Sequence, residues 1–275
     1  MEGIGKEKRC PPFFFITIAM KTALLQSDIV WAEPEKNRRH FEEMMQRTEA
    51  DLYVMPEMFD TGFVVTPEEC ISPEWGEKTL CWMQDMAERR NAAVCGSVAV
   101  RVQENGEEQW RNRMYFVRPR KEGGVTVYDK HHLFEYGGET LSYTPGQKRV
   151  VAEWRGVRFL LEVCFDLRFP MWARCMDDYD CIIYVASWPN KRQHAWDILL
   201  QARAMENQSY VLGVNRIGKD PVCEYDGGTV VVYPYGNVVA AAPNGSEAVV
   251  TAEFDMEKLR AFREKFPVLK DRDFA

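Results

Sequence analysis

Short apolar runs without a polar face limit what this chain can fold into more than any other feature. Residues 181–186, CIIYVA, form the clearest run, and residues 16–25 contain another near the start of the chain. A strand that is apolar on both faces needs cover on both sides, because neither face can be left in water. The predicted strands also outnumber the predicted helices. Further strands are expected at residues 52–55, 93–102, 110–117, 125–128, 150–154, 157–163, 210–214, 229–233, 238–242 and 248–254.

Helices are expected between these strands. One opens at residues 33–35 and carries an apolar stripe at Phe41, Met44 and Met45, which are spaced i, i+3 and i+4. Two stacked sheets with helices outside cover the apolar faces economically. We therefore predict an α/β fold, a four-layer α-β-β-α sandwich of two mixed sheets. The other predicted helices span residues 77–91, 195–208 and 256–266.

The sequence predicts a single domain over residues 15–275, because no linker or break in composition divides it. Residues 1–14 are interpreted as an N-terminal extension, and Met20 is another candidate start. Basic residues followed by the run FFFITIA could pass for a secretory signal, but Lys21 interrupts the run and no clear small-x-small cleavage site follows. The run is also too short to span a membrane.

Charge and cysteine content narrow the classes of function. A formal net charge of −7 without a dominant basic block disfavours nucleic acid as a partner, since nucleic-acid affinity depends on clustered Lys and Arg. A small-molecule substrate is expected instead, with no membrane partner. The eight cysteines form no Cys-x-x-Cys pair, and the four histidines show no ligand spacing with them. We therefore predict no metal site, reduced thiols and a cytoplasmic protein.

Three ionisable residues come at or just after the ends of predicted strands. They are Glu57, Lys130 and Cys164, and they supply a carboxylate, an ammonium and a thiol. These are the parts needed to cleave an acyl–nitrogen bond. Taken singly, each has an ordinary interpretation: Cys164 as a small core residue, Glu57 as a turn cap and Lys130 as a solvated charge.

At these residues the chain resembles the nitrilase superfamily of carbon–nitrogen hydrolases. Its three signatures appear in order at residues 55–59 (MPEMF), 129–134 (DKHHLF) and 164–170 (CFDLRFP). Three signatures at compatible spacing are far more specific than any one of them. Within the superfamily the chain is most similar to the omega-amidase branch, which hydrolyses amides of α-keto dicarboxylic acids such as 2-oxoglutaramate. Supporting segments lie at residues 111–113, 144–146, 187–189, 202–207 and 263–267.

The resemblance implies catalytic residues and a reaction. Glu57, Lys130 and Cys164 match the family's Glu–Lys–Cys triad, and Glu139 matches its second glutamate, with Glu135 as the alternative. The implied activity is an amidase that acts on small ω-amides through a thioester, with no cofactor or metal. Family members usually stack their sandwiches through the face near the nucleophile-bearing segment, so a homodimer is expected.

Residues near Cys164 are candidates for binding the oxyanion and the substrate. Phe165 stands where the family commonly has Tyr, so its backbone N–H is retained but any role for a hydroxyl is lost. Trp188 either lines the pocket or packs the loop. Arg168 is a candidate for recognising a substrate carboxylate, with a Tyr hydroxyl as the alternative. Glu162 interrupts an apolar strand and needs a partner or a raised pKa if it is buried.

Proton transfer from thiol to carboxylate is the chemical difficulty of such a site. The unperturbed pKa is about 8.5 for Cys and about 4.3 for Glu, a gap of about 4 units that corresponds to roughly 6 kcal/mol. Burial is expected to raise the pKa of Glu57, and Lys130 is expected to lower the pKa of Cys164. Closing the gap needs both shifts.

Other functions remain open from the residues alone. A nitrile or an N-carbamoyl compound could replace the amide, because the same triad would serve all three substrates. A non-catalytic binding protein could retain the same sandwich. His131, His132 and His194 allow a Cys–His protease site, although nothing else in the sequence is typical of one.

Overall fold

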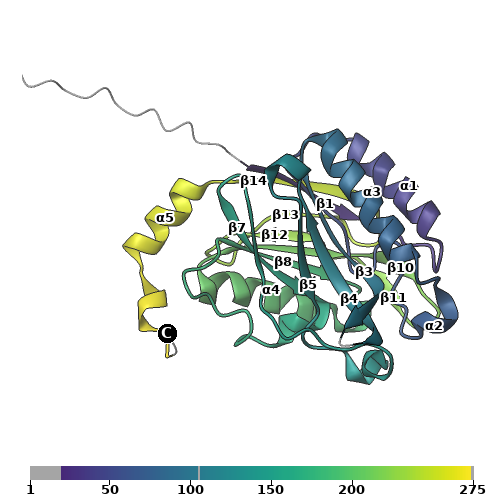
Figure 1. Cartoon of the computed structure of the whole chain (residues 1–275). Coiled ribbons are helices and arrows are strands. Elements are labelled where there is room, and N and C mark those ends of the chain that lie inside the picture. The colour runs from purple at the N-terminus through teal and green to yellow at the C-terminus, as the bar shows by residue number, and fades with distance from the viewer. Residues whose placement is uncertain (1–19, 105, 274–275) are drawn as a thin grey trace, which may run out of the picture.

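The computed structural model describes residues 20–104 and 106–273, in which two β-sheets stack face to face (Figure 1). The first sheet has the strand order β14-β1-β2-β3-β4-β5, with bounds β1 Met20–Gln26, β2 Leu52–Val54, β3 Ala93–Glu104, β4 Glu107–Val117, β5 Val125–Asp129 and β14 Ala248–Phe254. The second has the order β13-β12-β9-β8-β7-β6, with bounds β6 Val151–Trp154, β7 Val157–Val163, β8 Cys181–Ala186, β9 Tyr210–Asn215, β12 Val230–Val232 and β13 Val238–Ala241.

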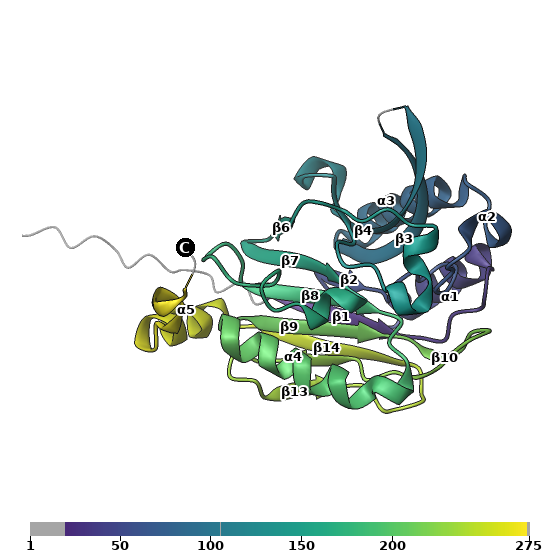
Figure 2. The ribbon, with the colours of Figure 1, turned by 90° about the horizontal axis from the view of Figure 1, so that it is seen from below.

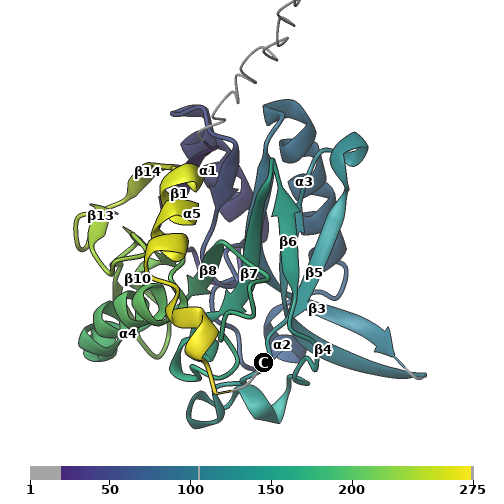
Figure 3. The same ribbon diagram turned by 90° about the vertical axis from the view of Figure 1, so that its left-hand side faces the viewer.

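Helices cover the outer faces of both sheets, which confirms the predicted four-layer sandwich. α1 Pro34–Gln46 and α3 Trp75–Arg90 lie on the first sheet, and α4 Gln193–Asn207 lies on the second (Figure 2). A further helix, α5 Met256–Lys265, lies at one end of the stack (Figure 3). The shorter helices are α2 Pro67–Cys70 and the 3₁₀ turns η1 Arg120–Glu122, η2 Glu135–Gly137, η3 Glu139–Leu141, η4 Cys164–Arg168, η5 Asn190–Arg192 and η6 Val268–Asp271.

The core follows from the alternation of side chains along each strand. In β1, Leu24 packs between the sheets, whereas Ala23 and Leu25 pack against the helices, since successive strand residues face opposite sides. Phe41 and Met44 of α1 lie in that second layer, so the predicted apolar stripe is buried. β8 is buried along its whole length, as its two apolar faces require.

Strand directions bring chemically important segments to one end of the molecule. β2 runs parallel to β3, and β5 has the same direction because β4 is antiparallel to both β3 and β5. The carboxyl ends of β2 and β5 therefore lie at the same end of the first sheet. β7 is parallel to β8 in the second sheet, and the turn η4 follows it directly.

The structure adds elements that the sequence pattern did not predict. They are α2 and a two-stranded hairpin formed by β10 Ile217–Lys219 and β11 Glu224–Asp226. Each is three or four residues long, too short for a hydrophobic period to be recognised. No helix among the described residues is long and apolar enough to cross a membrane. Residues 1–14 lie outside the described residues, so the extension and the single-domain boundary stay predictions.

Candidate active site

Three predicted residues meet between the two sheets. Glu57 follows β2, Lys130 follows β5 and Cys164 follows β7, and all three side chains are buried. Lys130 Nζ lies 2.9 Å from Glu57 Oε1. The charges of the Glu57 carboxylate and the Lys130 ammonium both act on the Cys164 thiol. The structure therefore brings the thiol, the carboxylate and the ammonium together.

A second buried carboxylate completes the charged cluster. Glu139 Oε2 accepts a hydrogen bond from Lys130 Nζ at 2.8 Å, and its Oε1 lies 3.1 Å from the same nitrogen. The backbone N–H of Phe134 donates to Glu139 Oε2 at 2.6 Å. Glu135, the alternative considered from sequence, is exposed. Glu139 is therefore the second glutamate that contacts Lys130.

Asn112 of β4 links the two carboxylates. Its Nδ2 donates to Glu57 Oε1 at 2.8 Å and to Glu139 Oε1 at 2.9 Å. Ser187, just after β8, holds the other oxygen of Glu57, since its backbone N–H donates to Oε2 at 2.9 Å. Sequence analysis did not identify either residue as part of the site. Their sequence signal is their position in the segments 111–113 and 187–189, which support the resemblance.

Backbone contacts fix the position of Lys130. Its N–H donates to Asn112 O at 2.9 Å, and its carbonyl accepts from the N–H of Gly146 at 2.9 Å. A Cβ at position 146 would lie 2.1 Å from Asp129 O, far inside van der Waals contact. Glycine is therefore required for the chain to pass this closely beside Lys130.

The turn that carries Cys164 is strained and tightly held. Cys164 has φ +46°, in the left-handed region that non-glycine residues seldom adopt. Asp166 braces the turn, because its Oδ2 accepts from Val163 N–H at 3.0 Å and from Tyr128 Oη at 2.8 Å. Its Oδ1 accepts from the backbone N–H of His132 at 2.9 Å. These bonds join β7 to the segment after β5 and support the unusual backbone at the thiol.

Burial keeps the thiol in its neutral form. It raises the pKa of Cys164 well above the usual range, and the negative charge of Glu57 adds to the rise. Lys130 acts in the opposite direction, as expected from the sequence, but its effect is smaller. The expected effect of Lys130 on the pKa of Cys164 is therefore present, but the net shift is upward because desolvation outweighs one nearby cation.

The cluster keeps Lys130 charged. Burial alone would lower the pKa of Lys130, but Glu139 and Glu57 outweigh it, and the net shift is upward. Burial also raises the pKa of Glu139, and Lys130 opposes that rise. An ammonium that holds its proton this firmly can donate hydrogen bonds but is a poor base.

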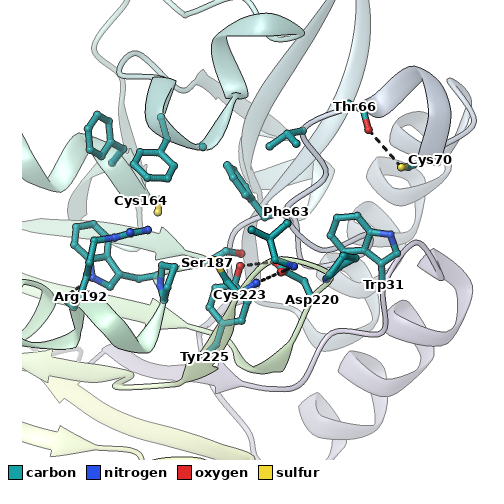
Figure 4. Close-up of a pocket in the computed structure, with 18 of the residues that line it drawn as sticks. Trp31, Phe63, Thr66, Cys70, Cys164, Ser187, Arg192, Asp220, Cys223 and Tyr225 are labelled. Atoms are coloured by element: carbon teal, nitrogen blue, oxygen red, sulfur yellow. Dashed lines mark hydrogen bonds between the residues drawn. The ribbon is translucent and has the colours of Figure 1, made fainter.

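A cavity of about 370 Å³ opens above the thiol (Figure 4). Cys164 lines it together with Phe165, Arg168 and Trp188, the predicted candidates for substrate contact. Trp188 Nε1 also donates to Arg192 O at 2.9 Å, so this residue both lines the pocket and packs its loop. Within residues 20–104 and 106–273, no group of His, Cys, Asp and Glu has the arrangement of a metal site.

The histidines make contacts with residues other than the thiol. His132 Nδ1 lies 2.8 Å from Asp166 Oδ1, and the His131 ring stacks on Trp172 with centroids 3.7 Å apart. His194 is exposed on α4. The charged groups that act on the thiol are Glu57, Lys130 and Glu139, which does not support the Cys–His alternative.

Glu162 lies on β7 with its side chain fully buried, and neither carboxylate oxygen has a hydrogen-bond partner among the described residues. Burial raises the pKa of Glu162 well above the usual range, and the nearby charge of Asp166 raises it further. Of the two possibilities considered from sequence, a partner or a raised pKa, the second is correct.

Comparison with known proteins identifies related sequences along nearly the whole chain. The sequence pattern of the family described as carbon-nitrogen hydrolase matches residues 21–264. Omega-amidase YafV of Escherichia coli (strain K12) is 43% identical over 256 residues, which cover 92% of this chain and 97% of the relative. The 2-oxoglutaramate amidase of Bacillus subtilis (strain 168) is 33% identical over 253 residues, which cover 90% and 95%.

Solved structures share the architecture. A CN-hydrolase superfamily protein from Xanthomonas campestris, crystallised with an arsenic adduct in its active site, superposes with a TM-score of 0.87. It is 33% identical, and the match covers 94% of this chain and 98% of that one. Nit3 of Saccharomyces cerevisiae, a member of the nitrilase superfamily, has the same fold with a TM-score of 0.80 at 23% identity, covering 93% of this chain and 97% of that one.

Proposed function

Because this chain belongs to the carbon–nitrogen hydrolase family, we propose that it is a cysteine-dependent omega-amidase. Its reaction is hydrolysis of the terminal amide of small α-keto dicarboxylic acid monoamides, such as 2-oxoglutaramate, to the acid and ammonia. The names of the relatives at 43% and 33% identity support this substrate class. One observation carries the chemistry: the Glu57 carboxylate contacts both the Cys164 thiol and the Lys130 ammonium beside an apolar cavity.

Glu57 is the general base in this proposal. Its carboxylate has a larger effect on the Cys164 thiol than the carboxylate of Glu139 has. The raised pKa of Cys164 means that the thiol is protonated in the free enzyme at neutral pH. Deprotonation therefore accompanies attack, with the proton passing from the thiol to the Glu57 carboxylate.

Acylation releases ammonia. Cys164 Sγ forms a bond to the amide carbonyl carbon, and the carbonyl oxygen becomes an oxyanion. The Lys130 ammonium and the backbone N–H of Phe165 stabilise that oxyanion in this scheme. The tetrahedral intermediate then breaks its carbon–nitrogen bond, Glu57 returns the proton to the leaving nitrogen, and a thioester remains on Cys164.

Deacylation reverses the proton path. Glu57 takes a proton from water as the water attacks the thioester carbonyl, and the same proton restores the thiol when the carbon–sulfur bond breaks. Each cycle consumes one amide and one water and yields one carboxylic acid and one ammonia. Glu139 and Asn112 act as positioning residues, since they hold Lys130 and the Glu57 carboxylate in place.

Ammonia release from a substrate panel tests the function. We expect wild-type turnover of 2-oxoglutaramate to exceed turnover of simple nitriles and N-carbamoyl amino acids. Cys164→Ala and Glu57→Gln should abolish turnover with the fold retained, and mass spectrometry of a quenched wild-type reaction should show an acyl group on Cys164. Strong turnover of a nitrile without turnover of the keto-amide would overturn the substrate assignment. Undiminished activity of Cys164→Ala would remove Cys164 as the nucleophile.

We propose a cytoplasmic homodimer with no nucleic-acid partner. The cysteines within the described residues are free thiols, which supports a reducing compartment, and the net charge of −7 disfavours polyanions. For the dimer, the supporting feature is the exposure of apolar side chains on α4 and just after η4, since Met171, Ile198 and Met205 are 65%, 52% and 57% exposed. Light scattering should report a dimer for the wild type and a monomer for Met205→Lys. A monomeric wild type would refute the dimer.

A further inference from the structure

Two arginines line the same cavity as Cys164. They are Arg168 of η4 and Arg192 of η5, and among the described residues that line the cavity they are its positively charged groups. Neither guanidinium has an ion-pair or hydrogen-bond partner within residues 20–104 and 106–273. An arginine in a largely apolar pocket that has no anionic partner can bind the anionic group of a ligand.

Each guanidinium group lies over an aromatic ring of the cavity. The guanidinium carbon of Arg168 lies 5.0 Å from the ring centre of Trp188, and that of Arg192 lies 5.0 Å from the ring centre of Phe134. Phe134 in turn lies 5.1 Å from the ring of Phe165, the residue after Cys164. Figure 4 shows Arg192 at the same end of the pocket as Cys164. A guanidinium over an aromatic ring keeps N–H groups free for a planar acceptor.

The one acidic residue among the described lining residues does not neutralise these arginines. Asp220 Oδ1 accepts from the N–H groups of Val222 and Cys223 at 2.8 and 2.6 Å. Its Oδ2 accepts from Tyr225 Oη. The Asp220 carboxylate is therefore held within its own loop and forms no ion pair with either arginine among the described residues.

We propose that Arg168 and Arg192 together bind the carboxylate at the far end of the substrate, and that Arg192 is a specificity-determining residue. This inference rests on the proposed amidase function and adds the residues that recognise the substrate's carboxylate. The carboxylate of an α-keto acid offers coplanar oxygens, which guanidinium groups bind through paired hydrogen bonds. The reacting amide then faces Cys164, and short amides without an anionic end bind poorly.

A matched pair of substrates tests the arginine pair. 2-Oxoglutaramate carries the carboxylate, and 4-oxopentanamide has a methyl group in its place with the same keto-amide chain. We expect Arg192→Gln and Arg168→Gln each to raise KM for 2-oxoglutaramate by about 10- to 100-fold, the range for loss of a charged hydrogen bond. The value of kcat/KM for 4-oxopentanamide should stay within about two-fold of wild type. Arg192→Lys should recover only part of the loss, because an ammonium lacks the planar fork.

Lys191→Gln is the matched control. Lys191 is an exposed cation next to Arg192 that does not line the cavity. Its substitution removes the same charge from the same turn, so a long-range electrostatic effect would appear in both variants. We expect Lys191→Gln to leave KM for both substrates unchanged. An equal rise in KM for Lys191→Gln and Arg192→Gln would overturn direct contact.

Binding measurements separate this inference from the proposed function. Calorimetry with the Cys164→Ala variant should detect binding of 2-oxoglutarate. Adding Arg192→Gln to this variant should weaken that binding by the same factor by which Arg192→Gln raises KM for 2-oxoglutaramate. If wild type hydrolyses 2-oxoglutaramate but the arginine variants lose activity equally on both amides, or lose none, the arginine pair is refuted while the amidase stands. If wild type hydrolyses neither amide and 2-oxoglutarate does not bind, the amidase proposal fails and the arginine pair fails with it.

Discussion

Replacing Glu162 by Gln should stabilise the protein increasingly as the pH rises. Burial, and then the charge of Asp166, raises the pKa of Glu162 in the folded protein, so the folded state binds this proton more tightly than the unfolded state does. The resulting stabilisation is fully present below the unfolded pKa of about 4.3 and is lost as the pH rises through the folded pKa. Glutamine has nearly the same shape as protonated Glu162 and does not ionise, so the stability of the variant does not fall in this way as the pH rises.

The magnitude follows from linkage. Between the unfolded and folded pKa values, each pH unit changes the free energy of unfolding by about 1.4 kcal/mol for one group. Over the pH range between those two values the variant should therefore gain stability relative to wild type, by about 1.4 kcal/mol for each pH unit. Near pH 4.5 the two proteins should be similar, because a protonated carboxyl and an amide fill the same space.

Urea unfolding at pH 5, 6, 7 and 8 and at one protein concentration measures this difference. Glu153→Gln is the control, since Glu153 is an exposed glutamate on the neighbouring strand β6 and its substitution should add no pH slope. A difference between Glu162→Gln and wild type that stays constant over this range would refute the reasoning. It would mean that Glu162 keeps the same charge in the folded and unfolded states.

Three further substitutions test the cluster around the thiol. Asn112→Ala removes the donor shared by the Glu57 and Glu139 carboxylates, so kcat should fall at least about 10-fold and the free energy of unfolding should fall by about 2 kcal/mol. An unchanged rate of ammonia release would exclude a positioning role for Asn112. Gly146→Ala forces a methyl group against Asp129 O and should displace Lys130, so kcat should fall about 100-fold with circular dichroism unchanged. Full activity would contradict the close approach of residue 146 to Asp129. Lys130→Ala removes the cation that pairs with two buried carboxylates, so it should cost about 3–5 kcal/mol of stability at pH 8. The cost should be smaller at pH 5, because burial raises the pKa of Glu139 and favours its protonation. Equal thermal destabilisation at both pH values would contradict the pairing.

Long-range architecture was predictable from this sequence because its signals are periodic. The apolar faces of residues 181–186 required cover on both sides, and the stripe at Phe41 and Met44 required a helix against a sheet. The strand ends then indicated which ionisable residues could meet. β10 and β11 escaped prediction because three residues carry no readable period.

The balance of forces at the site could not be read from the sequence. Asn112 lies in a strand, where an amide gives no local sign that it reaches two carboxylates from other segments. The net shift of the Cys164 pKa depends on whether the effect of burial exceeds the opposing effect of the Lys130 charge. Both quantities arise only when the sheets have stacked.

The proposed nucleophile and its proposed base belong to opposite halves of the sandwich. Cys164 ends a strand of the second sheet, whereas Glu57 and Lys130 end strands of the first. The alignment of the reacting atoms is therefore set by the sliding and rotation of one sheet on the other. Phe116 of the first sheet packs against Phe159 of the second, so a substitution that misaligns the sheets at this contact is expected to lower activity before it unfolds the chain.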